Sequence, residues 1–101
     1  MSQGYWMVHV DVHDPEGYQK YVKANAVAFA KYGARFLVRG GKYLVTRGKA
    51  AERNVVIEFR DYETAVACHD SAEYRQAAKL RDAASDADLV IVEGYDGPQP
   101  G

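Results

Sequence analysis

Residues 5–15, YWMVHVDVHDP, predict the first two elements of the fold. Branched apolar residues alternate with mixed ones along this stretch, which predicts a β-strand with two unlike faces. The first face carries Trp6, Val8, Val10 and Val12, and the second carries Tyr5, Met7, His9 and Asp11. Asp14 is a favourable N-cap, and Pro15 suits the first turn of a helix. The stretch therefore predicts a strand that passes directly into a helix.

The predicted helix ends at Gly33, a suitable C-terminal cap. Along it, mostly aromatic and apolar residues recur at spacings of three and four, which is the pattern of a helix with one buried face. This stripe consists of Tyr18, Tyr21, Val22, Asn25, Phe29 and Tyr32. Further along, Gly40-Gly41 supplies the positive φ of a tight hairpin turn and predicts two strands around it. The strands predicted after the helix cover Arg35–Arg39, Tyr43–Arg47, Val55–Phe59 and residues 87–95.

A second helical region lies between the last two predicted strands. Asp61 can cap its start, and Ser71 can cap a continuation, so a break is expected near Asp70–Ser71. The element order is then β-α-β-β-(β)-α-β, with one strand of ambiguity over residues 43–58. This order predicts an α+β, ferredoxin-like sandwich, in which two helices cover one face of an antiparallel sheet. We expect one domain over residues 1–101, with a turn-rich tail over 94–101.

Composition narrows the class of protein. The chain has 13 Lys and Arg against 14 Asp and Glu, a net charge of −1, which disfavours binding to nucleic acids or membrane surfaces. The single cysteine excludes an internal disulfide framework, and the first residues do not resemble a signal peptide. We therefore expect a cytoplasmic protein. The 8 tyrosines favour an interface or a ligand cavity.

The uncovered sheet face should be too apolar for contact with water alone. It is expected to hold Met7, Leu37 and Val56, with His9, Arg39 and Glu58 among them. A sheet that packs against a second sheet has this character. The sequence therefore predicts a homodimer through the open sheet face, with the three polar residues near a shared interior.

The candidate site residues each have a structural alternative. His9 is the candidate general base and Glu58 its orienting partner, or both are paired interface residues. Arg39, beside two glycines, is the candidate anion-binding residue, or half of an ion pair with Glu58. Asn25, Tyr74 and Arg81 are candidate substrate-binding residues, although hydrogen bonds to the sheet or to a bent backbone explain Asn25 better and core packing is the default for Tyr74.

Other chemical signatures are weak. Cys68 and His69 are adjacent on a predicted helix and point about 100° apart, which is poor for a nucleophile–base pair. The histidines form no zinc signature, and nucleotide-binding and hydrolase motifs do not occur. We expect no metal and no cofactor; haem binding is a distant alternative.

Several segments resemble one family over nearly the whole chain, roughly residues 4–98. They are GYWMVHVDVHDPEGYQKYV, FLVRGG, NVVIEF, SAEYRQAAKLR and VIVEGYDG. In order and content they resemble the family known as domain of unknown function 1330, which is similar to the wider dimeric α/β-barrel group. That group includes cofactor-free monooxygenases, muconolactone isomerases, stress-responsive proteins and a haem-dependent chlorite dismutase type. The resemblance implies a homodimer and supplies no reaction.

Two functions remain open at this point. The first is a homodimer that binds a small anionic or aromatic metabolite, as a cofactor-independent monooxygenase or isomerase. The second is a non-catalytic binding or interaction module whose sheet face is only a dimer interface. A cavity of ~300 Å³ with convergent His9, Arg39 and Glu58 would favour the first.

Overall fold

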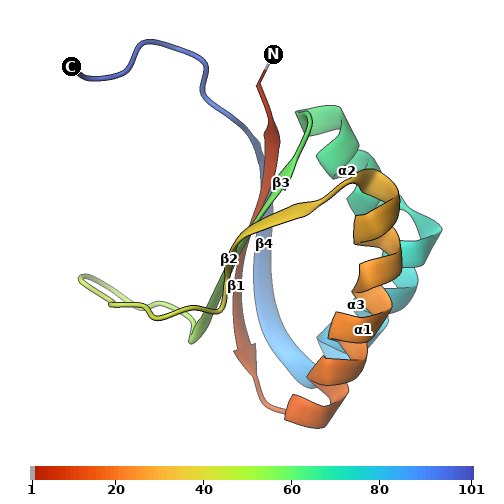
Figure 1. Ribbon diagram of the computed structural model, residues 1–101. Helices are drawn as coiled ribbons and strands as arrows, with labels where there is room; N and C mark the ends of the chain where they lie inside the picture. The colour runs from red at the N-terminus through yellow and green to blue at the C-terminus, as the bar shows by residue number, and fades with distance from the viewer. Residues whose placement is uncertain (1) are drawn as a thin grey trace.

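The computed structural model describes residues 2–101 and has the predicted α+β, ferredoxin-like architecture. The strands are β1 (Gly4–Val12), β2 (Arg35–Arg39), β3 (Arg53–Phe59) and β4 (Ser85–Glu93). The helices are α1 (Pro15–Tyr32), α2 (Tyr62–Asp70) and α3 (Ala72–Ala84). The strands form one antiparallel sheet in the order β2-β3-β1-β4, and all three helices lie against the same face of it (Figure 1).

The predicted helix boundaries are confirmed, and their causes are visible. The Asp14 side chain accepts a hydrogen bond from the Gly17 backbone N–H at 3.2 Å, and Gly33 ends α1 with a φ of +68°. The expected break in the second helical region falls at Ser71. Its Oγ accepts from the backbone N–H of Tyr74 at 3.1 Å and donates to the Cys68 carbonyl at 2.7 Å. One serine thus ends α2 and begins α3.

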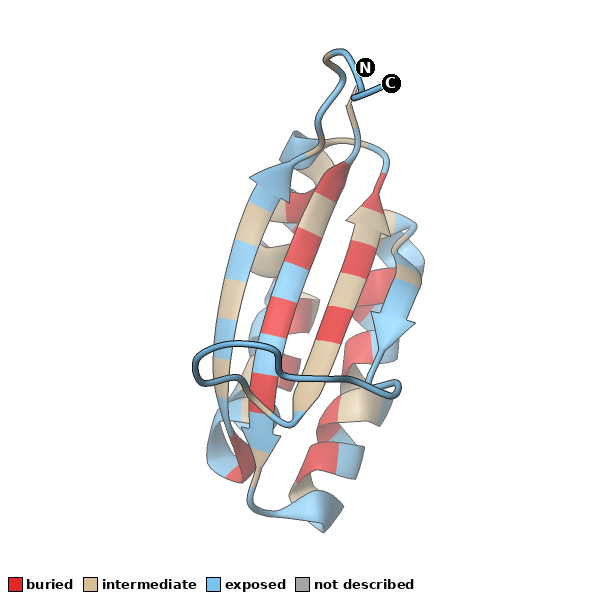
Figure 2. Ribbon diagram, turned by 90° about the vertical axis from the view of Figure 1, so that its left-hand side faces the viewer, coloured by how far each residue is buried: buried red, intermediate tan, exposed pale blue. Residues whose placement is uncertain are grey.

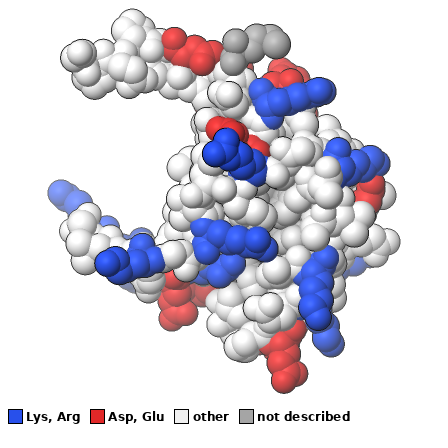
Figure 3. Space-filling view, viewed as in Figure 1, with Lys and Arg blue, Asp and Glu red and all other residues white. Residues whose placement is uncertain are grey.

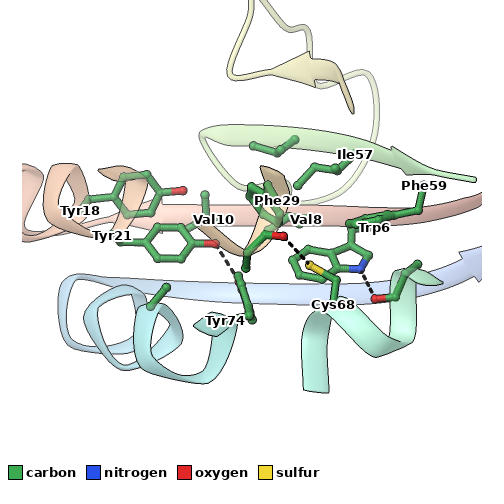
Figure 4. Close-up of a cluster of buried hydrophobic side chains, with 14 of the residues drawn as sticks. Trp6, Val8, Val10, Tyr18, Tyr21, Phe29, Ile57, Phe59, Cys68 and Tyr74 are labelled. Atoms are coloured by element: carbon green, nitrogen blue, oxygen red, sulfur yellow. Dashed lines mark hydrogen bonds between the residues drawn. The ribbon is translucent and has the colours of Figure 1, made fainter. Parts of the chain in front are cut away.

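The hydrophobic core lies between the helices and the sheet, centred on Trp6 (Figure 4). The alternation predicted for β1 is confirmed, since Trp6, Val8 and Val10 are buried. The Trp6 indole donates to the Ala65 carbonyl at 2.9 Å, and its ring meets that of Tyr74 edge to face at 4.8 Å. These contacts fix α2 and α3 against the same strand.

The predicted strand at Tyr43–Arg47 is wrong for the single chain. Residues 41–52 contain no strand or helix, and the expected tight hairpin turn does not form: Gly40 has a positive φ of +66°, but Gly41 does not. β2 pairs with β3 on one side, and no part of residues 41–52 pairs with its other edge. The last strand also begins earlier than expected, at Ser85, and ends at Glu93.

The sheet face opposite the helices is turned to the viewer in Figure 2; no helix covers it, and the segment between β2 and β3 crosses in front of it. Met7 and Val90 are direct cross-strand partners on this face, with exposed fractions of 40% and 55%. Val38 and Val92 extend the same surface and are also exposed. The predicted apolar open face is therefore present. Among the described residues, no helix combines the length and apolar character needed to cross a bilayer.

Candidate functional site

His9 lies on the open face near one end of β1. Its Nδ1 is 2.8 Å from Asn54 Oδ1 on β3. Because a carboxamide oxygen only accepts, the ring donates through Nδ1 in this contact, and Nε2 takes no part in it. Asp88 on β4 is the opposite cross-strand neighbour. A shallow hollow of about 330 Å³, shared with Asp11 and Lys49, adjoins this group. His9 and Asp11 share a face as predicted.

Glu58 also lies on the open face, but well away from His9. It accepts from the Tyr5 hydroxyl at 3.2 Å and lies 4.0 Å from the Arg35 guanidinium. The cross-strand partner of His9 is Asn54, four positions along β3 from Glu58. At ~3.3 Å per residue, the two positions are about 13 Å apart. Within one protomer, Glu58 therefore does not orient His9.

Arg39 lies on the opposite face of the sheet from the one predicted. The pairing of β2 with β3 shifts between Phe36 and Val38, so the alternation of faces slips by one residue. Arg39 consequently pairs with Val55, which is buried under the helices. Its guanidinium carbon lies 4.0 Å from the centre of the Phe36 ring. The expected convergence of His9, Arg39 and Glu58 does not occur in the protomer.

A cleft lies between α1 and the β2–β3 edge of the sheet. Arg39 and Arg53 lie at this cleft, with the buried Asn25 on its α1 side. The apolar part of its lining includes Trp6, Tyr18, Tyr21, Phe29 and Phe36. Its interior offers only about 20 Å³, which is room for a single water molecule or two. The cleft is therefore nearly closed.

Two cationic side chains meet the cleft without an acidic partner. Across residues 2–101, neither Arg39 nor Arg53 takes part in an ion pair. The Arg53 Nε is buried and has no hydrogen-bond partner, and its guanidinium carbon lies 5.5 Å from the Tyr18 ring centre. A Cβ on Gly40 would collide with Nη1 of Arg53. The glycine thus leaves the space that the guanidinium occupies.

A buried hydrogen-bond chain runs from Arg81 towards the cleft. Nη1 of Arg81 donates to the Tyr74 hydroxyl at 2.8 Å. That hydroxyl lies 2.7 Å from the Tyr21 hydroxyl (Figure 4). Guanidinium groups cannot accept, so the Tyr74 proton is directed to Tyr21. Burial raises the pKa of Tyr21, opposed by hydrogen bonds from Tyr74 and Asn25. Burial likewise raises the pKa of Tyr74.

The side chains of Cys68 and His69, neighbours in the sequence, both contact the core. Cys68 is fully buried, its thiol points at the Ala28 carbonyl at 3.9 Å, and burial raises its pKa to about 12. The His69 ring packs edge to face on Trp6 at 5.7 Å. Among the described residues, no group of three or more acidic, histidine or cysteine side chains is placed to hold a metal ion.

Sequence reasoning missed Arg53 and gave Tyr18 and Tyr21 no role beyond the helix stripe. The strand predicted from the sequence starts at Val55 and leaves Arg53 outside it. The alternation of side chains in this strand could have identified it. Arg53 lies two and four residues before the buried Val55 and Ile57, so its side chain shares their face of the sheet.

Comparison with known proteins identifies the family. The model of the family described as domain of unknown function 1330 matches residues 3–95. The chain belongs to this family. No curated protein matches the sequence.

Solved structures similar to this family member show the same fold. A protein of unknown function from Rhodopseudomonas palustris, RPA0582, has a TM-score of 0.76 at 18% identity, over 95% of this chain and 85% of that one. SnoaB, a cofactor-independent oxygenase from Streptomyces nogalater, has a TM-score of 0.62 at 15% identity, over 96% and 97%. A dimeric ferredoxin-like protein of unknown function from Thermobifida fusca has a TM-score of 0.61 at 15% identity, over 91% of each chain.

Proposed function

We propose that this protein is a homodimer that binds a small aromatic anion in the cleft between α1 and the β2–β3 edge of each protomer. The observation that carries the proposal is the pair Arg39 and Arg53, which meet an aromatic-lined cleft without a carboxylate partner. A guanidinium fork matches a carboxylate or an enolate geometrically and electrostatically. The neighbouring rings of Tyr18 and Phe36 suit a flat, aromatic ligand.

The ligand enters at the arginines. Because the interior offers only about 20 Å³, the anionic group binds at the mouth, and the ring is admitted only when β2 moves away from α1. β2 is a five-residue edge strand followed by residues without regular structure, so this movement breaks few contacts. Inside, the Tyr21 hydroxyl and the Asn25 carboxamide provide hydrogen bonds for a ligand oxygen.

The homodimer is supported by the apolar open face. An antiparallel sheet that meets water on one side normally carries polar residues there, whereas this face exposes Met7, Val90 and Val92. The Thermobifida fusca neighbour is described as dimeric. Packing of two open faces would also enclose the hollow beside His9 between the protomers.

Cofactor-independent monooxygenase or isomerase chemistry is the finer form of the proposal, and the likeness to SnoaB is one of fold. His9 is its candidate base, since its Nε2 takes no part in the contact with Asn54. A second candidate function, a non-catalytic interaction module, is favoured by the existing partners of His9 and Glu58, which are Asn54 and Tyr5.

Ligand titration distinguishes the two functions. The probes are 4-hydroxybenzoate and its uncharged isostere 4-hydroxybenzamide, followed by calorimetry and by amide chemical shifts around Arg53. We expect the carboxylate to bind about tenfold more tightly than the amide, and Arg53→Gln and Arg39→Gln to abolish this preference. Arg75→Gln, an exposed arginine on α3, should retain it. Absence of carboxylate binding to the unmodified protein would favour the interaction module.

A further inference from the structure

The hydroxyl of Tyr21 accepts hydrogen bonds from two neighbours and keeps its own proton. The Tyr74 hydroxyl accepts from Arg81, so it must direct its proton to the Tyr21 oxygen, 2.7 Å away. The Asn25 carboxamide, one turn further along α1, donates to the same oxygen. A phenol has one O–H donor, and both of these contacts are accepted. Because Tyr21 lines the cleft, its proton is left for an acceptor inside it.

The rest of the cleft offers donors and no carboxylate. Nε of Arg53 is buried and has no hydrogen-bond partner in residues 2–101, although buried donors are nearly always paired. No aspartate or glutamate is among the residues that line the cleft. The space-filling view shows a cluster of cationic side chains at the middle of the molecule, level with β2, and no acidic side chain lies within that cluster (Figure 3). The lining therefore suits a ligand that presents negative oxygens.

The size of the interior limits what reaches Tyr21. The closed cleft holds about 20 Å³, which is room for one oxygen atom with its hydrogen-bond partners and excludes bulk water. A donor that is held in place beside such a space stabilises a negative oxygen better than water does, because it need not reorient as the charge appears. The Tyr21 hydroxyl is held in place by its own two donors.

The positive charge of Arg81 is transmitted to this hydroxyl. Burial raises the pKa of Tyr21, and the nearby Arg81 opposes the rise, so Tyr21 stays protonated while its surroundings favour negative charge. Successive hydrogen bonds polarise one another, which strengthens the last donor of the chain. The outer side of the Arg81 guanidinium contacts the exposed Asp82 at 3.1 Å, so the tyrosines take up only its inner side.

We propose that Tyr21 donates its proton in a hydrogen bond to a phenolate oxygen, and that the ligands are aromatic acids with an ionisable hydroxyl at the end opposite the carboxylate. On binding, the phenol O–H bond breaks, its proton passes to water and the electron pair stays on the oxygen. Tyr21 touches the ligand, whereas Tyr74 and Arg81 are positioning residues. This inference rests on the proposed binding of aromatic anions and names which of them the cleft selects.

The test measures the ionisation of a bound ligand. The probe is 3,5-difluoro-4-hydroxybenzoate, whose fluorine NMR shift distinguishes phenol from phenolate, titrated with pH in the presence of saturating protein. We expect the pKa of its hydroxyl to fall by about one unit or more on binding, which is a tenfold preference for the phenolate. Tyr21→Phe should remove most of this fall. Tyr32→Phe, on the same helix but outside the cleft lining, should retain it.

Arg81 variants test the chain behind Tyr21. Arg81→Met removes the donor to Tyr74 and the charge without touching the cleft, and it should reduce the phenolate preference severalfold. Arg81→Lys keeps a donor and a charge and should recover most of it. If Arg81 only stabilises the fold, Arg81→Met would lower the urea midpoint and leave the pKa of the bound probe unchanged, which would overturn its positioning role.

The outcomes separate the role of Tyr21 from the binding on which it rests. If the unmodified protein does not bind the probe, or if Arg53→Gln binds it equally well, the proposed function and the inference are overturned together. If binding depends on Arg53 but the pKa of the bound hydroxyl is unchanged, or if its fall survives Tyr21→Phe, the role of Tyr21 is overturned and the binding of aromatic anions stands.

Discussion

Replacing Tyr74 with phenylalanine breaks the buried hydrogen-bond chain at its middle. Tyr74 is 1% exposed and bonds both to Arg81, at 2.8 Å, and to Tyr21, at 2.7 Å. The change leaves the buried Tyr21 hydroxyl without this partner, which costs about 1–3 kcal/mol. The Arg81 side chain is 14% exposed and can be partly rehydrated, so its loss adds about 1 kcal/mol. We expect Tyr74→Phe to lower the free energy of unfolding by about 3 kcal/mol.

The double variant makes the prediction sharper. Tyr21→Phe alone leaves the Tyr74 hydroxyl still accepting from Arg81 but without an acceptor for its proton, a loss of about 1–2 kcal/mol. With both hydroxyls removed, Arg81 and Asn25 each lose one partner, but no buried hydroxyl is left unpaired. We therefore expect Tyr21→Phe/Tyr74→Phe to be no less stable than Tyr74→Phe alone, although additive effects would sum to about 4–5 kcal/mol.

Urea denaturation at fixed protein concentration measures these free energies, because the stability of the proposed dimer would depend on concentration. Trp6 is the single tryptophan and is 1% exposed, so its fluorescence reports unfolding of the core. Tyr95→Phe is the matched control: its exposed hydroxyl bonds only to the Pro98 carbonyl, and the change should stay within about 0.5 kcal/mol. If the losses caused by Tyr21→Phe and Tyr74→Phe add to within about 0.5 kcal/mol in the double variant, the proposed hydrogen-bond chain from Arg81 through Tyr74 to Tyr21 is refuted.

Three further predictions concern stability. Gly4→Ala should lower the free energy of unfolding by about 1–3 kcal/mol, because a Cβ there would lie 2.5 Å from the Asp61 carbonyl oxygen; an unchanged urea midpoint would contradict the close approach. Ser71→Ala should cost about 1 kcal/mol by removing the cap of α3, and Ser71→Asp, which can still accept from the Tyr74 N–H, should recover part of it; equal losses would argue against capping. Burial raises the pKa of Cys68 from 9.0 to about 12, so the unfolded chain releases this proton first, and stability should fall as the pH rises above about 9. Cys68→Ala should show a shallower fall between pH 9 and 10 in the same urea assay, and parallel pH curves would exclude the thiol as the cause.

The sequence predicted the local structure well where local chemistry decides it. Asp14, Gly33 and Ser71 act through the backbone within a few residues, so their capping roles could be read without tertiary information. The alternation in β1 identified its buried face for the same reason, since a strand side chain's direction follows from its position. The family assignment followed from segments spread over nearly the whole chain.

The candidate site was predicted less well, because it depends on pairing between distant strands. A single register shift between Phe36 and Val38 moves Arg39 to the helix-covered face. No local sequence pattern predicts this shift. His9 and Glu58 share a face as predicted, but the register of β1 and β3 separates them along the sheet. Arg53 joins Arg39 only through this pairing.

The sequence by itself determined the element order, the helix caps, the apolar open face and the absence of a strong charge. These follow from the period of hydrophobic residues and from short-range hydrogen bonding. Only the tertiary structure decided which cations share the cleft under α1, how Arg81 reaches Tyr21 through Tyr74, and that residues 43–47 find no strand within their own chain. Each of these depends on strand register and helix packing, which arise from the whole chain at once and not from any one stretch of it.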